Sequence, residues 1–350
     1  MECLTDCLKE GVRKKDFPGA AYAVVYKNGK VDKDYVGYRQ TVPKKITLNG
    51  NEIYDCASLT KVVSTTTMMM KLIETKRLSL EKSISDVLPD FRHDDVKIKH
   101  ILTHTSGLPA DIPRARRLSN RDDVATRIYD MDLIHPPGQS VIYSDVGFIL
   151  LGWVIESVTG KRLDTFARET IFTPLKMKDT SYHPDKERAA PTEIRDDKVH
   201  QGLLKGDVHD EKAYALGGEA GHAGMFSTVD DLSRFILSFL NNDEKVLKKE
   251  TVDMLFPVRI DDTSNQDVRH VRSYGWQKPT KGGTAGDKVD FESTILHTGF
   301  TGCNLFIDRK HEIGFVLLSN AVHPKRKNNK IGHYRHKLAN MIMAKKENME

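Results

Sequence analysis

The sequence predicts a protein of the α/β (α+β) class, in which a sheet is built from both ends of the chain around a mainly helical insertion. Two observations lead to this prediction. Strand-like segments concentrate at the two ends of the chain, and the long region between them carries mainly helical patterns. No repeats or low-complexity linkers separate these parts, so we expect them to share one interface.

The N-terminal end combines an amphipathic helix with a β-hairpin. Residues 1–10 have helical periodicity, and residues 20–26 and 31–37 flank the turn residues Asn28-Gly29, which tight hairpins favour. The C-terminal end has four strand-like segments and a closing helix, over residues 273–277, 290–296, 303–307, 313–319 and about 328–344. Helical patterns between the ends cover residues 98–103, 121–129, 145–158, 162–171, 229–240 and 249–255.

Composition and charge indicate an ordinary globular protein. The 350 residues are 39% hydrophobic and 29% charged, and the net charge of +5 is too small and too scattered to indicate nucleic-acid binding. The basic runs 114–117 and 325–327 are interpreted as solvated loops. No apolar stretch approaches the ~20 residues that span a bilayer. The N-terminus lacks the apolar core of a signal peptide, so a cytoplasmic location is expected, although a protein whose export signal has been removed would look the same.

Ser58 and Lys61 are the main candidates for catalysis. A Ser-x-x-Lys pair that opens a helix places both side chains on one face, so the lysine nitrogen can reach the serine hydroxyl. The helix start adds N–H donors for an attacked carbonyl oxygen and a dipole that disfavours the ammonium form of Lys61. The segment from Ser79 to Lys82 fits the same pattern, but its neighbours indicate a surface turn or a helix cap.

A serine nucleophile of this kind needs a proton shuttle and a second donor to the oxyanion. Tyr143, at a predicted helix entrance, is the candidate shuttle, and the alternative is a packing tyrosine beside an N-cap at Asp145. The sequence His297-Thr298-Gly299 ends a predicted strand. Its glycine allows close backbone approach, so this strand is the candidate wall for an acyl substrate.

In this order, the three motifs resemble those of the penicillin-recognising serine hydrolases, in particular the branch of class C β-lactamases, DD-peptidases and family VIII esterases. Residues 101–109, 217–228 and 274–276 are also similar to that branch, and the resemblance covers about residues 15–345. It implies a β-lactamase/transpeptidase-like fold, with an antiparallel sheet flanked by helices (1–80 and 265–350) and an inserted helical domain (81–264). The active site is then expected in the cleft between them.

The resemblance also implies roles for individual residues. Ser58 would be acylated, and Lys61 and Tyr143 would move protons, although the sequence leaves open which of them is the main base. The backbone N–H groups of Ser58 and Phe300 would form the oxyanion hole. The substrate-binding residues would be Asp145, His222, His297, Thr298 and Gly299. Small acyl or peptide-like molecules, including β-lactams, would be the ligands.

Two residues depart from the family pattern. Asp145 stands where asparagine is usual, and a carboxylate near Lys61 favours the ammonium, which shifts base duty toward Tyr143. His297 stands where β-lactamases commonly have lysine, which argues against efficient turnover of β-lactams. With an unperturbed pKa of about 6.5, His297 would be partly cationic near pH 7 and would attract a substrate carboxylate mainly at lower pH.

The expected function is a serine acyl-hydrolase that acts through an acyl-enzyme on an ester, amide or peptide-like substrate. One alternative is a D-alanyl-D-alanine-type carboxypeptidase or D-aminopeptidase, and another is a penicillin- or peptidoglycan-binding protein without turnover. A metal hydrolase that uses residues 207–210 and His222 is disfavoured, because no H-E-x-x-H or comparable ligand spacing is present. Neither a metal nor a cofactor is expected.

Overall fold

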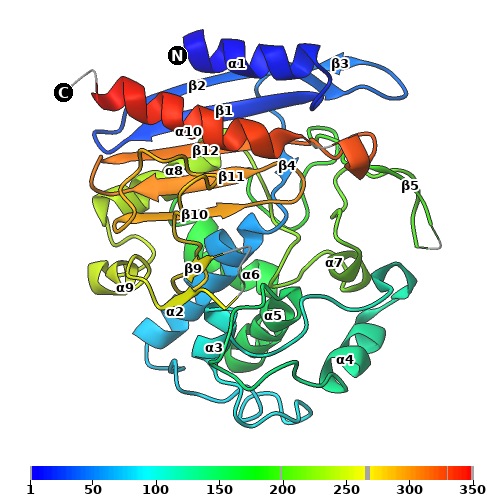
Figure 1. Cartoon of the computed structure of the whole chain (residues 1–350). Coiled ribbons are helices and arrows are strands. Elements are labelled where there is room, and N and C mark those ends of the chain that lie inside the picture. Colours follow the sequence, from blue (N-terminus) through cyan, green and yellow to red (C-terminus); the bar gives the residue numbers. More distant parts are fainter. Residues whose placement is uncertain (1, 198, 265–268, 329, 348–350) are drawn as a thin grey trace.

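The computed structural model describes residues 2–197, 199–264, 269–328 and 330–347, and its central element is a six-stranded antiparallel sheet (Figure 1). The strand order is β10-β11-β12-β1-β2-β3. These strands comprise Gly19–Tyr26 (β1), Val31–Gln40 (β2), Ile46–Thr47 (β3), Thr294–Thr298 (β10), Asn304–Asp308 (β11) and Ile313–Ser319 (β12). Ala20 of β1 lies opposite Ser319 of β12, so the two ends of the chain meet in the middle of the sheet.

Helices cover both faces of the sheet, because its strands are apolar on both sides. Figure 1 shows the helices Glu2–Arg13 (α1) and Ile331–Glu347 (α10) on one side of the sheet. In β1, Val24 belongs to the core on that side. The next residue, Val25, belongs to the opposite core, where the helix Val229–Asn241 (α8) packs on β1 and β12. Successive side chains of a strand point to opposite faces, so one short strand supplies both cores.

The remaining helices form a second layer, which Figure 1 places below the sheet. They comprise Thr67–Glu74 (α2), Ile98–Leu102 (α3), Arg121–Tyr129 (α4), Asp145–Thr159 (α5), Leu163–Ala167 (α6), Glu211–Ala215 (α7) and Lys249–Asp253 (α9). Short strand pairs connect them: Tyr54–Asp55 (β4) with Phe226–Ser227 (β7), Ile194–Asp196 (β5) with Gln201–Leu203 (β6), and Ile260–Asp262 (β8) with His270–Arg272 (β9). None of the helices among the described residues is long and apolar enough to cross a membrane.

The helix α5 is the buried centre of this second layer. Ten consecutive residues, from Val146 to Ile155, are buried. Ser144 caps the N-terminus by accepting a hydrogen bond from the N–H of Gly147, and Gly160 ends the helix in the left-handed conformation. Both ends of α5 are therefore fixed by local sequence, and its first turn carries Asp145 to a defined place.

The predicted strand at residues 273–277 is wrong. Gln277 forms only isolated bridges, to Arg272 and to Leu296. The chain turns at Gly275, whose φ is +74° and whose N–H donates to the carbonyl oxygen of Leu102. The aromatic residues at 274 and 276 alternate with small residues as in a half-buried strand, which explains the wrong prediction. The segment is instead a turn that packs against the helical layer.

The strand predicted at residues 290–296 is shifted toward the C-terminus in the structure, where it comprises Thr294–Thr298. A turn precedes it, because the carboxylate of Asp290 accepts hydrogen bonds from the N–H and the hydroxyl of Ser293. The predicted domain limits stay a prediction. The helix α8 lies within 81–264 yet packs on the sheet, and the limit at residue 265 falls outside the described residues.

Gly275→Ala should destabilise the protein. A Cβ at Gly275 would lie 2.0 Å from Oγ1 of Thr66, in a backbone conformation that side chains disfavour. We expect the free energy of unfolding to fall by roughly 2–5 kcal/mol, from left-handed backbone strain and overpacking together, as measured by urea denaturation. Gly29→Ala is the matched control, since Gly29 has φ +88° and a Cβ there would meet no atom within 4 Å beyond its chain neighbours. Equal losses in both variants would contradict a packing role at Gly275.

Candidate active site

Ser58 lies in the turn between β4 and the π-helical segment Lys61–Thr66, which continues into α2. The preceding residue, Ala57, has φ +45°, and its N–H donates to the carboxylate of Asp55 at 2.8 Å. The N–H of Lys61 donates to the carbonyl oxygen of Ser58, which starts the helical turn. Ser58 lines a cavity of about 420 Å³, and this cavity is the candidate active site.

Lys61 is fully buried and joins the predicted residues into one group. Its Nζ lies 3.0 Å from Oγ of Ser58, 3.0 Å from the carbonyl oxygen of His222 and 2.8 Å from Oδ1 of Asp145. It also lies over the ring of Tyr143, 4.9 Å from the ring centroid. The structure thus brings Ser58, Lys61, Tyr143 and Asp145 together, as the motif order suggested.

The ion pair between Lys61 and Asp145 is charged at both ends. Burial works against the ammonium of Lys61, but Asp145 and Tyr143 outweigh it, so the pKa of Lys61 is raised. Burial likewise works against the carboxylate of Asp145, but Lys61 and the neighbouring cations keep the pKa of Asp145 below its usual value. An ammonium cannot accept the proton of Ser58. This favours the predicted shift of base duty toward Tyr143.

Tyr143 is held by the segment that contains His104. The carbonyl oxygen of His104 accepts a hydrogen bond from the N–H of Ile142 at 2.9 Å, and its Nδ1 accepts one from the N–H of Ser144 at 3.0 Å. The two rings are 4.6 Å apart. Burial and nearby cations keep the pKa of His104 well below its usual value, so Nδ1 stays available as an acceptor. The two neighbours of Tyr143, Ile142 and Ser144, therefore both donate hydrogen bonds to His104.

The expected cation at His297 is wrong. His297 is 3% exposed, and its Nδ1 lies 2.9 Å from the carbonyl oxygen of Thr298, to which it donates. Burial, followed by the charges of Arg272 and Lys61, lowers the pKa of His297 to about 3. The imidazole is neutral near pH 7, so it cannot attract a carboxylate in the way that the sequence suggested.

The turn after His297 closes against the nucleophile. A Cβ at Gly299 would lie 2.6 Å from the carbonyl oxygen of Cys56, so the close approach that this glycine permits is to the Ser58 turn rather than to a substrate. Thr298 and Phe300 line the cavity. The Phe300 side chain is 56% exposed and stacks on the ring of His209, with the ring centroids 5.6 Å apart.

Sequence analysis missed Arg272, the last residue of β9. Its side chain is buried, lines the cavity and lies over the ring of Tyr143 at 5.2 Å. Within the described residues, its Nε and Nη1 have no hydrogen-bond partner. Burial lowers the pKa of Arg272, but an arginine keeps its charge in proteins. The only local signal was its position just before the turn at Gly275, because a single arginine matches no motif.

His222 contributes mainly through its backbone, since its carbonyl oxygen holds Lys61. Its ring nitrogen Nε2 lies 2.7 Å from Oδ1 of Asp210. Lys212 pairs with Asp210 at 2.9 Å and with Asp145 at 3.3 Å. Asp145, Asp210 and His222 present possible metal-ligand atoms within 4.8 Å of one another. Lys61 and Lys212 already balance these carboxylates, which leaves the group unsuited to a cation.

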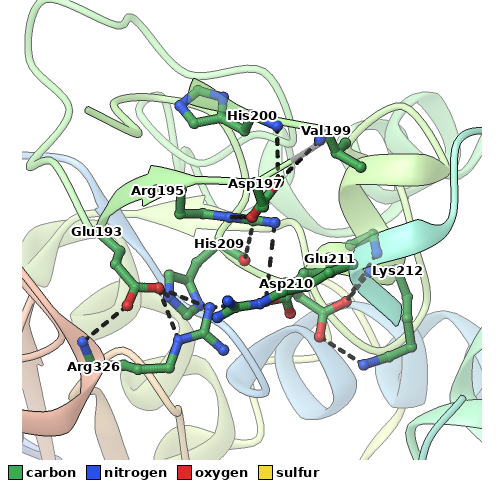
Figure 2. A network of polar contacts seen from close by, with 12 residues as sticks. Glu193, Arg195, Asp197, Val199, His200, His209, Asp210, Glu211, Lys212 and Arg326 are labelled. Atoms are coloured by element: carbon green, nitrogen blue, oxygen red, sulfur yellow. Dashed lines mark hydrogen bonds and ion pairs between the residues drawn. The ribbon is translucent and has the colours of Figure 1, made fainter. Parts of the chain in front are cut away.

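A second polar network, shown in Figure 2, supports the wall of the cavity that carries His209. Glu193 accepts from Arg326 at 2.7 Å and lies 3.1 Å from Nε2 of His209. Arg326 also pairs with Glu211 at 2.8 Å, and Arg195 donates to the carbonyl oxygen of His209 at 3.3 Å. These partners fix the main chain of His209 and the ring on which Phe300 stacks.

The competing serine lies elsewhere. Ser79 is exposed, and its carbonyl oxygen accepts a hydrogen bond from the N–H of Lys82 in a turn. Lys82 pairs with Asp86 at 3.0 Å and not with the serine hydroxyl. The interpretation of this pattern as a surface turn is confirmed.

The family model described as Beta-lactamase matches residues 4–340. The chain belongs to the Beta-lactamase family. A Bacillus subtilis (strain 168) relative, named N-acetylmuramyl-L-alanine amidase, is 27% identical over 353 residues, which cover 88% of this chain and 78% of the relative. An Escherichia coli (strain K12) relative, a putative D-alanyl-D-alanine carboxypeptidase, is 32% identical over 306 residues, which cover 77% of this chain and 69% of the relative.

Several solved structures share the fold. A mutant of the simvastatin synthase LovD from Aspergillus terreus has a TM-score of 0.78 at 20% identity, covering 99% of this chain and 95% of the other. The hydrolase EstCE1 has a TM-score of 0.78 at 19% identity, with 98% of both chains covered. A class C β-lactamase mutant has a TM-score of 0.73 at 17% identity, covering 95% of this chain and 97% of the other. The predicted β-lactamase/transpeptidase-like fold and the membership in this family of serine hydrolases are confirmed.

Asp145→Asn should move the acid limb of the acylation pH profile to lower pH. Loss of the anionic partner removes what raises the pKa of Lys61, so Lys61 gives up its proton at lower pH and, as a free amine, takes over from Tyr143 as the base for Ser58. We expect a shift of about 1–3 pH units, measured as the rate of acylation by an activated ester from pH 5 to 9. Asp111→Asn is the matched control, because Asp111 lines the same cavity but pairs with Lys212. An acid limb that stays in place in Asp145→Asn would contradict this role of the ion pair.

Proposed function

We propose that this protein is a serine acyl-hydrolase that cleaves an amide, peptide or ester bond in a substrate that carries a carboxylate. The observation that carries the proposal is the buried guanidinium of Arg272 in the same cavity as Ser58. A buried charge without a partner is costly, and a carboxylate is the group that pairs best with the two N–H vectors of a guanidinium. A substrate carboxylate would therefore bind at Arg272 and orient the scissile bond.

The chemistry follows from the contacts around Ser58. Oγ of Ser58 attacks the carbonyl carbon, and Tyr143 relays the proton: its phenol oxygen takes the proton of Oγ while its own hydroxyl proton passes to the leaving group as the scissile bond breaks. Lys61, held as the ammonium, lies 3.0 Å from Oγ and stabilises the negative charge that develops there. The N–H groups of Ser58 and Phe300 would bind the oxyanion. Water then attacks the ester at Ser58, which releases the acid and restores the serine.

The relatives support an amide or peptide substrate. Two of them are named as an amidase and as a putative D-alanyl-D-alanine carboxypeptidase. In a substrate of the carboxypeptidase type, the leaving group ends in a carboxylate, which suits Arg272. β-Lactams carry a carboxylate as well, so we expect them to bind and acylate Ser58. Efficient β-lactam turnover is not part of the proposal, because neutral His297 replaces the lysine of true β-lactamases.

The alternative is a binding protein of the same fold that is acylated without turnover. Ser58, Lys61 and Tyr143 are all present and in contact, which favours turnover. A D-aminopeptidase remains a variant of the proposed hydrolase, distinguished by which end of a peptide is removed. A cytoplasmic location also stays a proposal, which fractionation of cells that produce the full-length protein would test.

Ser58 should carry the acyl group. After exposure to a fluorescent penicillin or a p-nitrophenyl ester, intact mass and peptide mapping should place the adduct on the peptide that contains Ser58. Ser58→Ala should abolish labelling and hydrolysis, whereas Ser79→Ala, the matched control, should retain both. Ester turnover supports the hydrolase, and a stable adduct without turnover supports the binding protein. An adduct on another serine would overturn both.

Arg272→Gln should selectively impair substrates that carry a carboxylate. A hydrogen bond to a charged group is worth ~1.5–3 kcal/mol, so kcat/KM for a D-alanyl-D-alanine peptide should fall by roughly 10–150-fold. A neutral ester should change little. In the parent protein, the ratio of the two kcat/KM values should stay flat from pH 5.5 to 8, because arginine stays charged and His297 stays neutral.

The matched control for this selectivity is Arg269→Gln. Arg269 precedes the same short strand, but its guanidinium is exposed and pairs with Asp261 at 2.8 Å. It should leave both kcat/KM values unchanged. Equal losses for the peptide and the neutral ester in Arg272→Gln would show that Arg272 supports the fold of the cavity rather than binding a carboxylate.

A further inference from the structure

Asp55 is a buried carboxylate that none of the catalytic motifs includes. It is the last residue of β4, three positions before Ser58, and is 2% exposed. Its main chain is anchored because β4 pairs with β7, with Asp55 opposite Phe226, and the N–H of Cys56 donates to the carbonyl oxygen of Met225 at 3.0 Å. The rest of the fold therefore fixes the position from which Asp55 acts.

The side chain of Asp55 shapes the turn that presents the nucleophile. One oxygen, Oδ1, accepts a hydrogen bond from the N–H of Ala57 at 2.8 Å, which is the side-chain turn typical of aspartate. Ala57 has φ +45°, a conformation that costs energy for a residue with a Cβ and persists only where its surroundings hold it. The peptide that follows supplies the N–H of Ser58. The other oxygen, Oδ2, accepts from the N–H of His209 at 2.7 Å.

The carbonyl oxygen of Asp55 contacts the chain segment of Phe300, the residue proposed to supply the second N–H donor of the oxyanion hole. It accepts a hydrogen bond from the hydroxyl of Thr301 at 2.7 Å and a weaker contact from Sγ of Cys303 at 3.5 Å. Thr301 is 1% exposed and directly follows Phe300. The residue before Ser58 and the residue after Phe300 are thus both hydrogen-bonded to Asp55, one to its side chain and one to its backbone.

We propose that Asp55 is a positioning residue that sets the spacing of the two N–H donors of the oxyanion hole. This inference rests on the proposed function, in which the N–H groups of Ser58 and Phe300 bind the oxyanion. Such donors act because they are already in place when charge develops, and the loss of one typically costs ~10²–10³ in kcat. Asp55 joins the chain segments of both donors through bonds shorter than 3 Å, so a change at Asp55 moves the donors relative to each other.

The first variant is Asp55→Asn. An asparagine offers one oxygen, so it cannot accept from both Ala57 and His209, and one of these N–H groups loses its partner. We expect kcat to fall by about 10–100-fold, less than for complete loss of a donor, while KM changes by less than about threefold. Affinity for phenylboronic acid, which forms a reversible tetrahedral adduct at Ser58, should fall by a similar factor.

The second variant keeps Asp55 and therefore covers the case in which Asp55→Asn does not fold. Thr301→Val removes only the hydroxyl that donates to the Asp55 carbonyl oxygen, with almost no change of shape. It should lower kcat and boronic-acid affinity together by about 5–20-fold, within the loss typical of one displaced donor. Thr301→Ser, which keeps the hydroxyl, should restore both. Thr159→Val is the matched control, because Thr159 also donates to a backbone carbonyl oxygen at 2.7 Å, at the far end of α5.

The outcomes separate this inference from the function on which it rests. If the parent protein is not acylated at Ser58, the proposed function fails. If the parent is acylated and Thr301→Val keeps its kcat and boronic-acid affinity within twofold, Asp55 does not position the oxyanion hole. If Thr301→Val raises KM as much as it lowers kcat/KM and Thr301→Ser restores nothing, the role of the contact is purely structural, and the inference is again overturned.

Discussion

The buried ion pair between Lys61 and Asp145 is the interaction on which the rest of the active site depends. It joins the π-helical turn after Ser58 to the first turn of α5, which are distant in sequence. Removing one partner of a buried pair leaves an uncompensated charge, at a typical cost of 3–5 kcal/mol. The pair constrains the chemistry because it keeps Lys61 charged. It also constrains the fold, because it holds the first turn of α5 close to Ser58. The tyrosine is left as the group that can exchange a proton with Ser58.

The positive charge for a substrate anion comes from an unexpected strand. The third motif begins with His297, which burial and two nearby cations keep neutral. The neighbouring Arg272 supplies a permanent charge from β9, over the ring of Tyr143. The two features are linked, because the fixed charge of Arg272 adds to the effect of burial and disfavours a second cation at the imidazole. Recognition of an anion at this site should consequently depend little on pH in the neutral range.

The sequence predicted those parts of the structure that local patterns determine. The hairpin around Asn28-Gly29, the long apolar α5 and the Ser58–Lys61 pair follow from turn chemistry and periodicity. Long-range contacts could not be predicted in this way. A side chain at Gly275 would clash with Thr66, and Arg272 matters because its Nε and Nη1 have no hydrogen-bond partner within the described residues. The pKa of His297 depends on charges from two other segments, which no motif encodes.

The strand order of the sheet also constrains how the protein is made. β1 lies between β2 and β12, and Ala20 pairs with Ser319, about 300 residues later in the chain. At a synthesis rate of roughly 5–20 residues per second, the N-terminal hairpin waits about 15–60 s for its partner. During that time an apolar strand edge and the sheet side of α1 lack their final cover. Completion of the sheet is therefore among the last events of biosynthesis, and a nascent chain that stops before β12 is a natural substrate for chaperones and proteases.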